Sequence, residues 1–423
     1  MESLKGDIAT LENEYAVDTT IEEMNAFQGI RELIETLKIK PETGSPMQGD
    51  YFNTVSRGAR LGKLYLRSAS SGVGKTRTMV GDSCKMAFPI RYDRKQGKWV
   101  STGSCERVVY IATEQDVAEI QTMILAYLTD INEEAFLYGR FDLVDMQLIT
   151  KAIDIMERFQ NNLWLVRVSD PSAGVVKNVI RKYHKQKQVN YVFYDYIFSS
   201  PAMLAEYRDL GLREDVVLRL FITELKNLAV ELNIFILTST QTSNDDGGGG
   251  FKDYHNVRGS KALVDLCDLA CIMSRPTSEE IEALRTENPD LNYSPNIVID
   301  VYKNRRGRWT QIRIWGCNDL GTCRREEVFV TDIKNVPIED FTLIDFHIDN
   351  ANINLNELEE YYNDGVIPSQ NQELLVDTFV EIVHDSQQAH AEREDDFFIT
   401  DAFDNQIDTY KRAKKRSLSS YFD

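Results

Sequence analysis

The stretch LYLRSASSGVGKTRTMVGDS, residues 64–83, is the most informative part of this 423-residue chain. It begins as an apolar β-prone run, passes through a loop of small residues and continues into a helical pattern. The loop ASSGVGKT has the phosphate-binding spacing, with Ala at the first of its two glycine positions. Small residues let consecutive backbone N–H groups wrap phosphates, the Lys adds positive charge, and the Thr hydroxyl can bind Mg²⁺. We therefore predict a nucleotide site formed by Ala69, Ser70, Ser71, Gly72, Val73, Gly74, Lys75, Thr76 and Arg77.

From residue 61 onward, short apolar runs alternate with helical patterns. Such alternation is typical of an α/β fold, a mainly parallel sheet with helices on both faces. Ligands bind such sheets at the carboxyl ends of the strands, so residues that directly follow a strand are candidates for the site. The predicted strands are residues 63–67, 107–112, 163–168, 191–194, 234–238, 269–273 and 296–302, and the clearest helices are 115–128, 174–187 and 214–232.

Three polar residues stand at the ends of predicted strands. Asp195 follows the run YVFY and is the expected metal-binding acid beside Thr76, although an Asp after a strand is also a common helix cap. Glu114 follows VVYIAT, where a carboxylate can orient and deprotonate a water; the alternative is a helix-start carboxylate stabilised by the dipole. Gln241 ends the run ILTSTQ, where a sensor of the γ-phosphate is expected, but taken alone it is weak evidence.

In this order the elements resemble the hexameric replicative helicases of the DnaB type, whose motor is a RecA-like ATPase domain. The most discriminating match is NVRGSKA, residues 256–262, followed by Asp265, which is similar to the family's R-G/E-S-G segment and its downstream aspartate. Lys261 stands in place of the expected glycine. The run KNRRG, residues 303–307, fits the K-x-R-x-G hairpin that in the family projects into the neighbouring subunit's ATP site. Without the resemblance, such a basic turn is more often a solvated hairpin.

The resemblance covers residues 44–332 and implies a RecA-like P-loop ATPase core in a homohexameric ring. It implies an enzyme that hydrolyses ATP with Mg²⁺, travels 5′ to 3′ on single-stranded DNA and unwinds duplex DNA at the replication fork. By the same resemblance, Lys75 and Thr76 hold the phosphates and Mg²⁺, and Asp195 holds the metal through water. Glu114 is then the base, and Gln241 couples the γ-phosphate to a pore loop. Lys303 and Arg305 act on the neighbour's nucleotide.

In the family, two loops on the pore side hold single-stranded DNA, and here they fall at residues 199–212 and 242–258. The second loop contains the run DDGGGGFK, whose glycines let the backbone approach phosphates closely. Lys252 and Arg258 add charge to it. Four glycines beside acids are equally typical of an unstructured surface loop. The first loop offers Arg208, but its bases are balanced by acids.

The chain is expected to have three parts. Residues 1–43 form an N-terminal arm with an apolar stripe at helical spacing over 20–38, which packs on its own domain or docks on a neighbouring subunit. Residues 44–332 form the motor domain. Residues 333–423 form an acidic C-terminal extension, whose tail from about residue 390 is expected to be partly disordered.

The negative charge is concentrated near the end of the chain. Residues 331–423 hold 7 Lys and Arg against 21 Asp and Glu, out of a net charge of -19. The rest is therefore close to neutral and can still carry a basic channel for nucleic acid. The acids and aromatic residues of the tail suit a basic partner such as a polymerase or primase. The alternative is a tail that only keeps the chain soluble.

No stretch approaches the roughly 18 apolar residues that span a bilayer, and no signal segment is evident, so we expect a cytoplasmic protein without membrane contact. Little room precedes residue 44 for the family's helical N-terminal domain. The chain is thus expected to be a bare motor of phage or mobile-element type, acting in a bacterial cell or phage-infected host with a separate primase or loader.

Two other functions remain open. One is a RecA- or KaiC-like ATPase that acts in recombination, repair or defence without unwinding. The other is a scaffold that binds ATP only to hold subunits together, against which Glu114 argues because a scaffold needs no catalytic base.

Overall fold

The computed structural model describes residues 25–39, 42–208, 211–242, 249–257, 261–287, 294–346 and 354–363. The chain separates into two compact units, Met1–Thr43 and Gly44–Asp423. Within the described residues, no helix is long and apolar enough to cross a membrane.

The described part of the first unit contains one helix, α2 (Ile30–Ile39). It is shorter than the helix predicted over 20–38, because residues 26–29 form a turn in which Gly29 takes a φ of +72°. Residues 20–24 lie outside the described residues. The predicted apolar stripe is exposed within this unit, with Leu33 at 53% of its surface and Phe27 in the turn at 75%.

The second unit is built on a nine-stranded sheet in the order β11-β10-β9-β8-β1-β7-β6-β4-β5. The six strands from β8 to β5 are parallel, whereas β9, β10 and β11 continue the sheet in antiparallel fashion. This confirms the predicted mainly parallel sheet. The strands are β1 (Leu64–Ala69), β4 (Val108–Ala112), β5 (Leu163–Arg167), β6 (Tyr191–Asp195), β7 (Phe235–Gln241), β8 (Leu269–Ser274), β9 (Ile297–Asn304), β10 (Ile312–Asp319) and β11 (Arg324–Asp332).

Four strands were not predicted. β2 (Ile90–Asp93) and β3 (Lys98–Ser101) form a separate two-stranded hairpin. β10 and β11 lack a clear apolar pattern because each buries an arginine: Arg313 and Arg325 have relative exposures of 1% and 4%. A buried charge that finds its partner in another segment cannot be recognised from local hydrophobicity.

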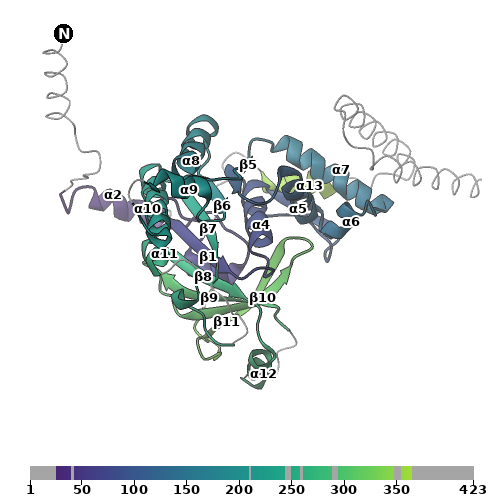
Figure 1. The fold of residues 1–423 in the computed structure, drawn as a ribbon. Coiled ribbons are helices and arrows are strands. Elements are labelled where there is room, and N and C mark those ends of the chain that lie inside the picture. Colours follow the sequence, from purple (N-terminus) through teal and green to yellow (C-terminus); the bar gives the residue numbers. More distant parts are fainter. Residues whose placement is uncertain are drawn as a thin grey trace, which may run out of the picture. The chain divides into compact units, whose positions relative to one another are not determined.

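Helices cover both faces of the sheet, as predicted, and Figure 1 shows the two layers. Alternate residues of one strand enter different cores: Tyr110 of β4 packs with one helix layer, and Val109 and Ile111 pack with the other. The first layer contains α3 (Asp50–Ser56), α4 (Lys75–Ala87), α5 (Val117–Thr129), α6 (Glu133–Leu137) and α7 (Leu143–Arg158). The second contains α8 (Ala173–Lys187), α9 (Pro201–Glu206), α10 (Glu214–Glu231) and α11 (Lys261–Leu266).

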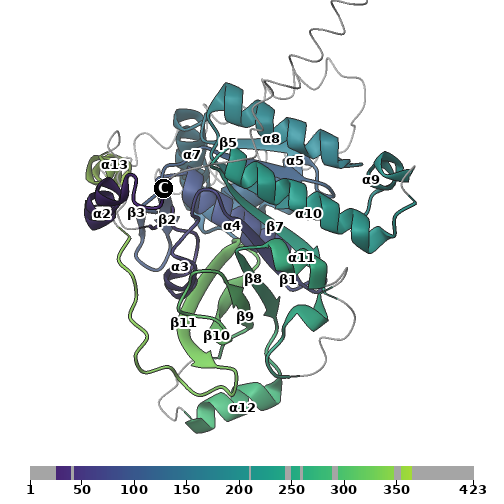
Figure 2. The ribbon, with the colours of Figure 1, turned by 90° about the vertical axis from the view of Figure 1, so that its left-hand side faces the viewer.

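The antiparallel strands form a distinct part of the unit (Figure 2). α12 (Ser278–Glu287) lies next to them, because its Leu284 packs with Val298 and Trp315, whereas the short 3₁₀ helix η2 (Tyr254–Asn256) contacts α11. Arg313 of β10 joins Asp300 of β9 to Glu280 of α12, with distances of 2.8 Å and 2.7 Å to the two carboxylates. This buried ion cluster fixes α12 to the sheet.

Part of the predicted C-terminal extension folds onto the second unit. The last helix among the described residues, α13 (Leu355–Asn363), buries Leu358 and Tyr362. Asn363 exchanges two hydrogen bonds of 2.8 Å with the backbone of Trp99 in β3. The domain boundary at residue 332 remains a prediction, and the tail from about residue 390 lies outside the described residues.

Candidate active site

The loop between β1 and α4 has the conformation that its small residues favour. Gly72 and Gly74 take φ values of +78° and +102°, which residues with a side chain rarely adopt. A Cβ on Gly74 would also lie 2.2 Å from Cδ2 of Leu320, so the conformation requires glycine there and an added methyl group would force the Leu320 side chain to move. α4 begins at Lys75 directly after the loop, with its N-terminal N–H groups available to an anion.

A cavity of about 710 Å³ opens over this loop. Ligand pockets typically have volumes of about 300–1,000 Å³, so the cavity is large enough for a nucleotide. It brings together residues that sequence analysis selected from separate segments, at the carboxyl ends of β1, β4 and β7: Ser70, Ser71, Gly72, Gly74, Lys75, Thr76, Arg77, Glu114 and Gln241 line it. Ala69, at the end of β1, and Val73, within the loop, are buried.

Asp195 ends β6 with its carboxylate buried and fully engaged. Its Oδ2 accepts hydrogen bonds from Thr76 Oγ1 at 2.6 Å and Tyr110 OH at 3.1 Å. Its Oδ1 accepts one from Ser239 Oγ at 2.8 Å. Burial, and then the nearby Asp195, raise the pKa of Tyr110 far above its usual value, so the phenol stays a donor. Sequence analysis found Thr76 and Asp195 but missed Tyr110 and Ser239, whose only signal is their place on neighbouring strands.

Oxygen donors of this kind fit a magnesium ion. A threonine hydroxyl and a carboxylate are hard ligands of the type that Mg²⁺ binds in nucleotide sites. The two groups lie within 2.6 Å of one another at the start of α4, beside the phosphate loop. Thr76 and Asp195 are therefore the residues that would hold the ion.

Lys75, Tyr196 and Glu114 form a second chain of contacts in the site. The Lys75 ammonium lies 4.0 Å from the centre of the Tyr196 ring. The Tyr196 hydroxyl donates to Oε1 of Glu114 at 2.8 Å. Burial lowers the pKa of Lys75, while the carboxylates of Asp195 and Glu114 act in the opposite direction. Phosphates entering the cavity would add negative charge beside this desolvated ammonium and favour its charged form.

Glu114 is held at the mouth of the cavity by the start of α5. Asp116 caps this helix by accepting from Glu119 N at 2.8 Å, and the Glu119 side chain accepts from Asp116 N at 3.1 Å. Glu114 itself stands between β4 and this cap and is exposed. The N-cap of α5 is thus Asp116, two residues after Glu114, and the alternative interpretation of Glu114 as a helix-start carboxylate stabilised by the dipole stays open.

Arg77 lines the same cavity, but its guanidinium is already engaged. It forms an ion pair with Glu133 and donates from Nη1 to the backbone oxygen of Leu320 at 2.8 Å. Its predicted contact with the nucleotide is thus not supported, since the charge that would attract phosphate is neutralised by Glu133.

Lys303 and Arg305 lie at the opposite edge of the sheet from the phosphate loop. β9 runs antiparallel to β8, so Asn304 pairs with Leu269 at the start of β8, whereas Ala69 pairs with Met273 near its end. Lys303 Nζ donates to the backbone oxygen of Val264 at 2.7 Å, and the Arg305 guanidinium donates to that of Asp265. Neither side chain can reach the nucleotide site of its own chain.

The predicted DNA contacts have different outcomes. Lys252 is only 6% exposed, and its backbone N–H donates to Asp300 at 3.0 Å, so its predicted contact with phosphate is not supported. Arg208 is exposed two residues after α9, a short helix inside the predicted loop 199–212. Arg258 lies outside the described residues.

Comparison with known proteins identifies the family. The family model described as "DnaB-like helicase C terminal domain" matches residues 46–319 of the chain. The chain belongs to this family. A relative in sequence, the SPbeta prophage-derived uncharacterized protein YorI of Bacillus subtilis (strain 168), is 31% identical over 316 residues. The match covers 73% of this chain and 62% of that relative's length.

Solved structures agree with the DnaB-like fold. A DnaB-like replicative helicase, studied with its interactions with primase, superposes with a TM-score of 0.53 at 14% identity, over 77% of this chain and 71% of that one. A solved ATPase domain gives a TM-score of 0.54 at 13% identity, over 73% of this chain and all of that one. At these identities the likeness concerns the fold alone.

Proposed function

We propose that this DnaB-like chain is an ATP-dependent replicative DNA helicase that assembles as a homohexameric ring. The ring translocates on single-stranded DNA and separates the duplex at the fork. The observation that carries the proposal is the position of Lys303 and Arg305 at the sheet edge opposite their own phosphate loop. A basic turn there serves hydrolysis only if it is donated to a neighbouring subunit.

The residues around the cavity have complementary tasks in this proposal. The backbone of residues 70–74 and the Lys75 ammonium bind the phosphates. Glu114, oriented by the Tyr196 hydroxyl at 2.8 Å, accepts a proton from the attacking water. Gln241, at the end of β7 and on the cavity wall, faces the γ-phosphate and leads into the loop that begins at residue 242.

Thr76 and Asp195 hold Mg²⁺, which when bound neutralises charge on the phosphate oxygens. Tyr110 and Ser239 hold the Asp195 carboxylate in place through their hydroxyl donors. Arg305 and Lys303 of the neighbour add positive charge where it develops on the transferred phosphoryl group. Hydrolysis then depends on assembly.

Strand separation on a forked DNA substrate tests the proposal, with Lys75→Ala as the inactive control. Mixtures of Arg305→Ala and Lys75→Ala subunits test the contribution from the neighbour. Each variant alone should be inactive, but a mixed interface can pair an intact phosphate loop with an intact Arg305, so mixtures should regain activity. Failure to regain any activity at every mixing ratio would contradict the assignment of Arg305.

An ATPase of the RecA or KaiC kind, which does not unwind, is the second candidate. The burial of Lys252 favours this candidate. Of the predicted DNA contacts within the described residues, Arg208 is the one that lies on the surface. Hydrolysis stimulated by single-stranded DNA without strand separation would support this candidate. Unchanged turnover in Glu114→Gln would instead support a scaffold that merely binds ATP.

The proposed partners are single-stranded DNA, further copies of the chain, and a primase or loader. The acidic C-terminal tail, proposed to dock on a basic replication protein, lies outside the described residues. Deleting residues 390–423 should weaken binding of a polymerase or primase, and unchanged binding would count against that role.

A further inference from the structure

The peptide of Gly250 is held on both sides by buried charged groups. Its N–H donates to Oε1 of Glu280 in α12 at 2.8 Å, and its carbonyl oxygen accepts from Nη2 of Arg313 in β10 at 3.3 Å. The same Arg313 nitrogen lies 2.7 Å from Oε1 of Glu280, so the two side chains also pair with one another. We call Glu280 and Arg313 the clamp. Hydrogen bonds to charged groups are stronger than those between neutral groups, so the clamp fixes the backbone at Gly250.

Both side chains of the clamp are themselves held in place. Glu280 is 7% exposed, and its Oε2 accepts from the backbone N–H of Thr277 at 2.9 Å. Arg313 is 1% exposed, and it donates from Nε to Asp300 at 2.8 Å and from Nη1 to Asn335 Oδ1 at 2.7 Å. Because the guanidinium is planar, partners for all three of its nitrogens leave it one orientation.

The backbone beside α12 favours glycine. Gly250 takes a φ of +101°, which residues with a side chain rarely adopt. A Cβ on Gly249 would lie 3.1 Å from Oγ1 of Thr277 and 3.3 Å from Cδ of Glu280, so the chain passes close to the start of α12. The last two glycines of the run therefore have a defined conformation.

The clamped peptide lies in the segment that returns from the proposed DNA loop to the sheet, residues 249–257, which we call the returning arm. Further along the arm, the backbone N–H of Lys252 donates to Oδ2 of Asp300 at 3.0 Å. At its end, Val257 forms an antiparallel bridge with Thr242, directly after β7. α12 and β9 thus hold the arm at two points, and the bridge ties it to the end of β7.

We propose that Glu280 and Arg313 are positioning residues for the binding of single-stranded DNA, because they set the conformation of the returning arm. This inference rests on the proposed function, in which the loop that begins at residue 242 holds the strand. The clamp does not touch DNA itself. It keeps the arm in the conformation that binds, so that little of the binding free energy is lost in ordering the arm.

Stimulation of ATP hydrolysis by a thymidine oligonucleotide, measured on the full chain, tests the inference. Glu280→Ala removes one half of the clamp and leaves Arg313 paired with Asp300. If the arm then spends about a tenth of its time in the binding conformation, the oligonucleotide concentration for half-maximal stimulation should rise about 10-fold. Hydrolysis without DNA and the KM for ATP should stay the same, because the clamp does not line the nucleotide cavity.

Gly250→Ala is a second variant, which removes no charge. A Cβ there would meet no atom within 4 Å, so the substitution acts through the strained φ, and it should raise the same concentration. The matched controls are Glu279→Ala, at the exposed neighbour of Glu280, and Gly97→Ala, at a glycine with a φ of +65° in the β2–β3 hairpin. Both controls should respond to the oligonucleotide as the wild type does.

An unchanged concentration for half-maximal stimulation in Glu280→Ala and Gly250→Ala would overturn the inference, as would an equal rise in Glu279→Ala. If Glu280→Ala also loses hydrolysis without DNA, its effect is a general loss of structure, and the response of Gly250→Ala alone decides. The proposed function fails in a different way, because the wild type itself would then show no response to the oligonucleotide.

Discussion

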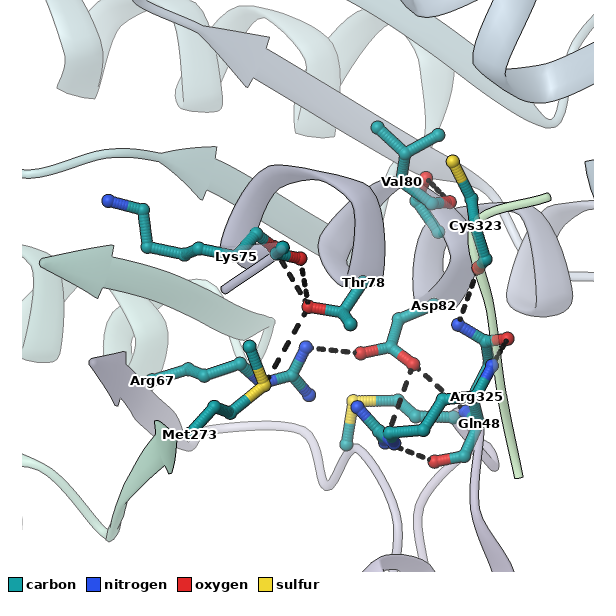
Figure 3. A network of polar contacts seen from close by, with 12 residues as sticks. Gln48, Arg67, Lys75, Thr78, Val80, Asp82, Met273, Cys323 and Arg325 are labelled. Carbon is teal, nitrogen blue, oxygen red and sulfur yellow. Dashed lines mark hydrogen bonds and ion pairs between the residues drawn. The ribbon is translucent and has the colours of Figure 1, made fainter. Parts of the chain in front are cut away.

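Asp82→Ala should strongly destabilise the second unit, because Asp82 neutralises buried arginines behind the phosphate loop. Its Oδ2 lies 2.7 Å from Nη1 of Arg67, and both side chains have an exposure of 0%. Its Oδ1 accepts from Gln48 N at 3.0 Å and lies 3.9 Å from Nη2 of Arg325. Figure 3 shows these groups converging on Asp82, which comes from α4, the helix that begins at Lys75.

The expected loss follows from the charges that remain. Arg325 keeps Glu327 as a buried partner at 3.2 Å, but Arg67 has no other ion pair among the described residues. Breaking a buried pair by removing one member costs about 3–5 kcal/mol. Because domains are stable by only about 5–15 kcal/mol, Asp82→Ala should lose a large part of the free energy of unfolding.

Urea unfolding measures this loss. Asp340→Ala is the matched control, since Asp340 pairs with Arg308 where both side chains are about two-thirds exposed, and it should cost no more than about 1 kcal/mol. The double variant Arg67→Met/Asp82→Leu removes both charges and should recover much of the loss. If Asp82→Ala costs no more than Asp340→Ala, or if the double variant is less stable than Asp82→Ala, the reasoning is refuted.

Four further outcomes are expected. Because burial lowers the pKa of Lys75, Lys75→Met should melt at or above the wild-type temperature without nucleotide, and thermal-shift assays should show no stabilisation by ATP. Tyr196→Phe should lower kcat about 10-fold with KM nearly unchanged in steady-state kinetics, as Glu114 loses its orienting hydrogen bond; a change confined to KM would contradict this. Gly74→Ala should abolish ATP binding in calorimetry, because φ is +102° and Leu320 occupies the space. Burial raises the pKa of Asp300 to about 6, so the folded state binds more protons than the unfolded state above about pH 4. The stability of the wild type, measured by urea titrations, should therefore fall relative to that of Asp300→Asn as the pH rises from about 4 to about 6. A rise in relative stability would contradict the assignment.

Features carried by one short run of sequence were recognisable. The phosphate loop is recognisable because its chemistry needs small residues, Lys75 and Thr76 in one continuous run. Asp195 and Glu114 were found because parallel strands bring their carboxyl ends to one edge of the sheet. The structure places Thr76 Oγ1 at 2.6 Å from Asp195 and lines one cavity with Glu114 and Lys75, although their roles in catalysis remain proposals.

Contacts between distant segments escaped prediction. Lys252 looked like a DNA contact because charge in a glycine-rich loop is normally solvated, yet the fold buries it at 6% exposure, with its backbone held by Asp300. β10 was missed because its buried Arg313 interrupts the apolar pattern. Tyr110 and Ser239 approach Asp195 only once β4, β6 and β7 lie side by side.

The amino-acid sequence alone determined the loop proposed to bind phosphates, the mainly parallel sheet and the order of motifs, since each depends on residue types within a short run. Only the tertiary structure decided which charges are buried and which edge of the sheet carries each turn. The physical reason is that burial and ion pairing depend on partners far away in the chain, as for Arg67 and Asp82. The position of Arg305 opposite its own phosphate loop depends in the same way on the antiparallel pairing of β9 with β8.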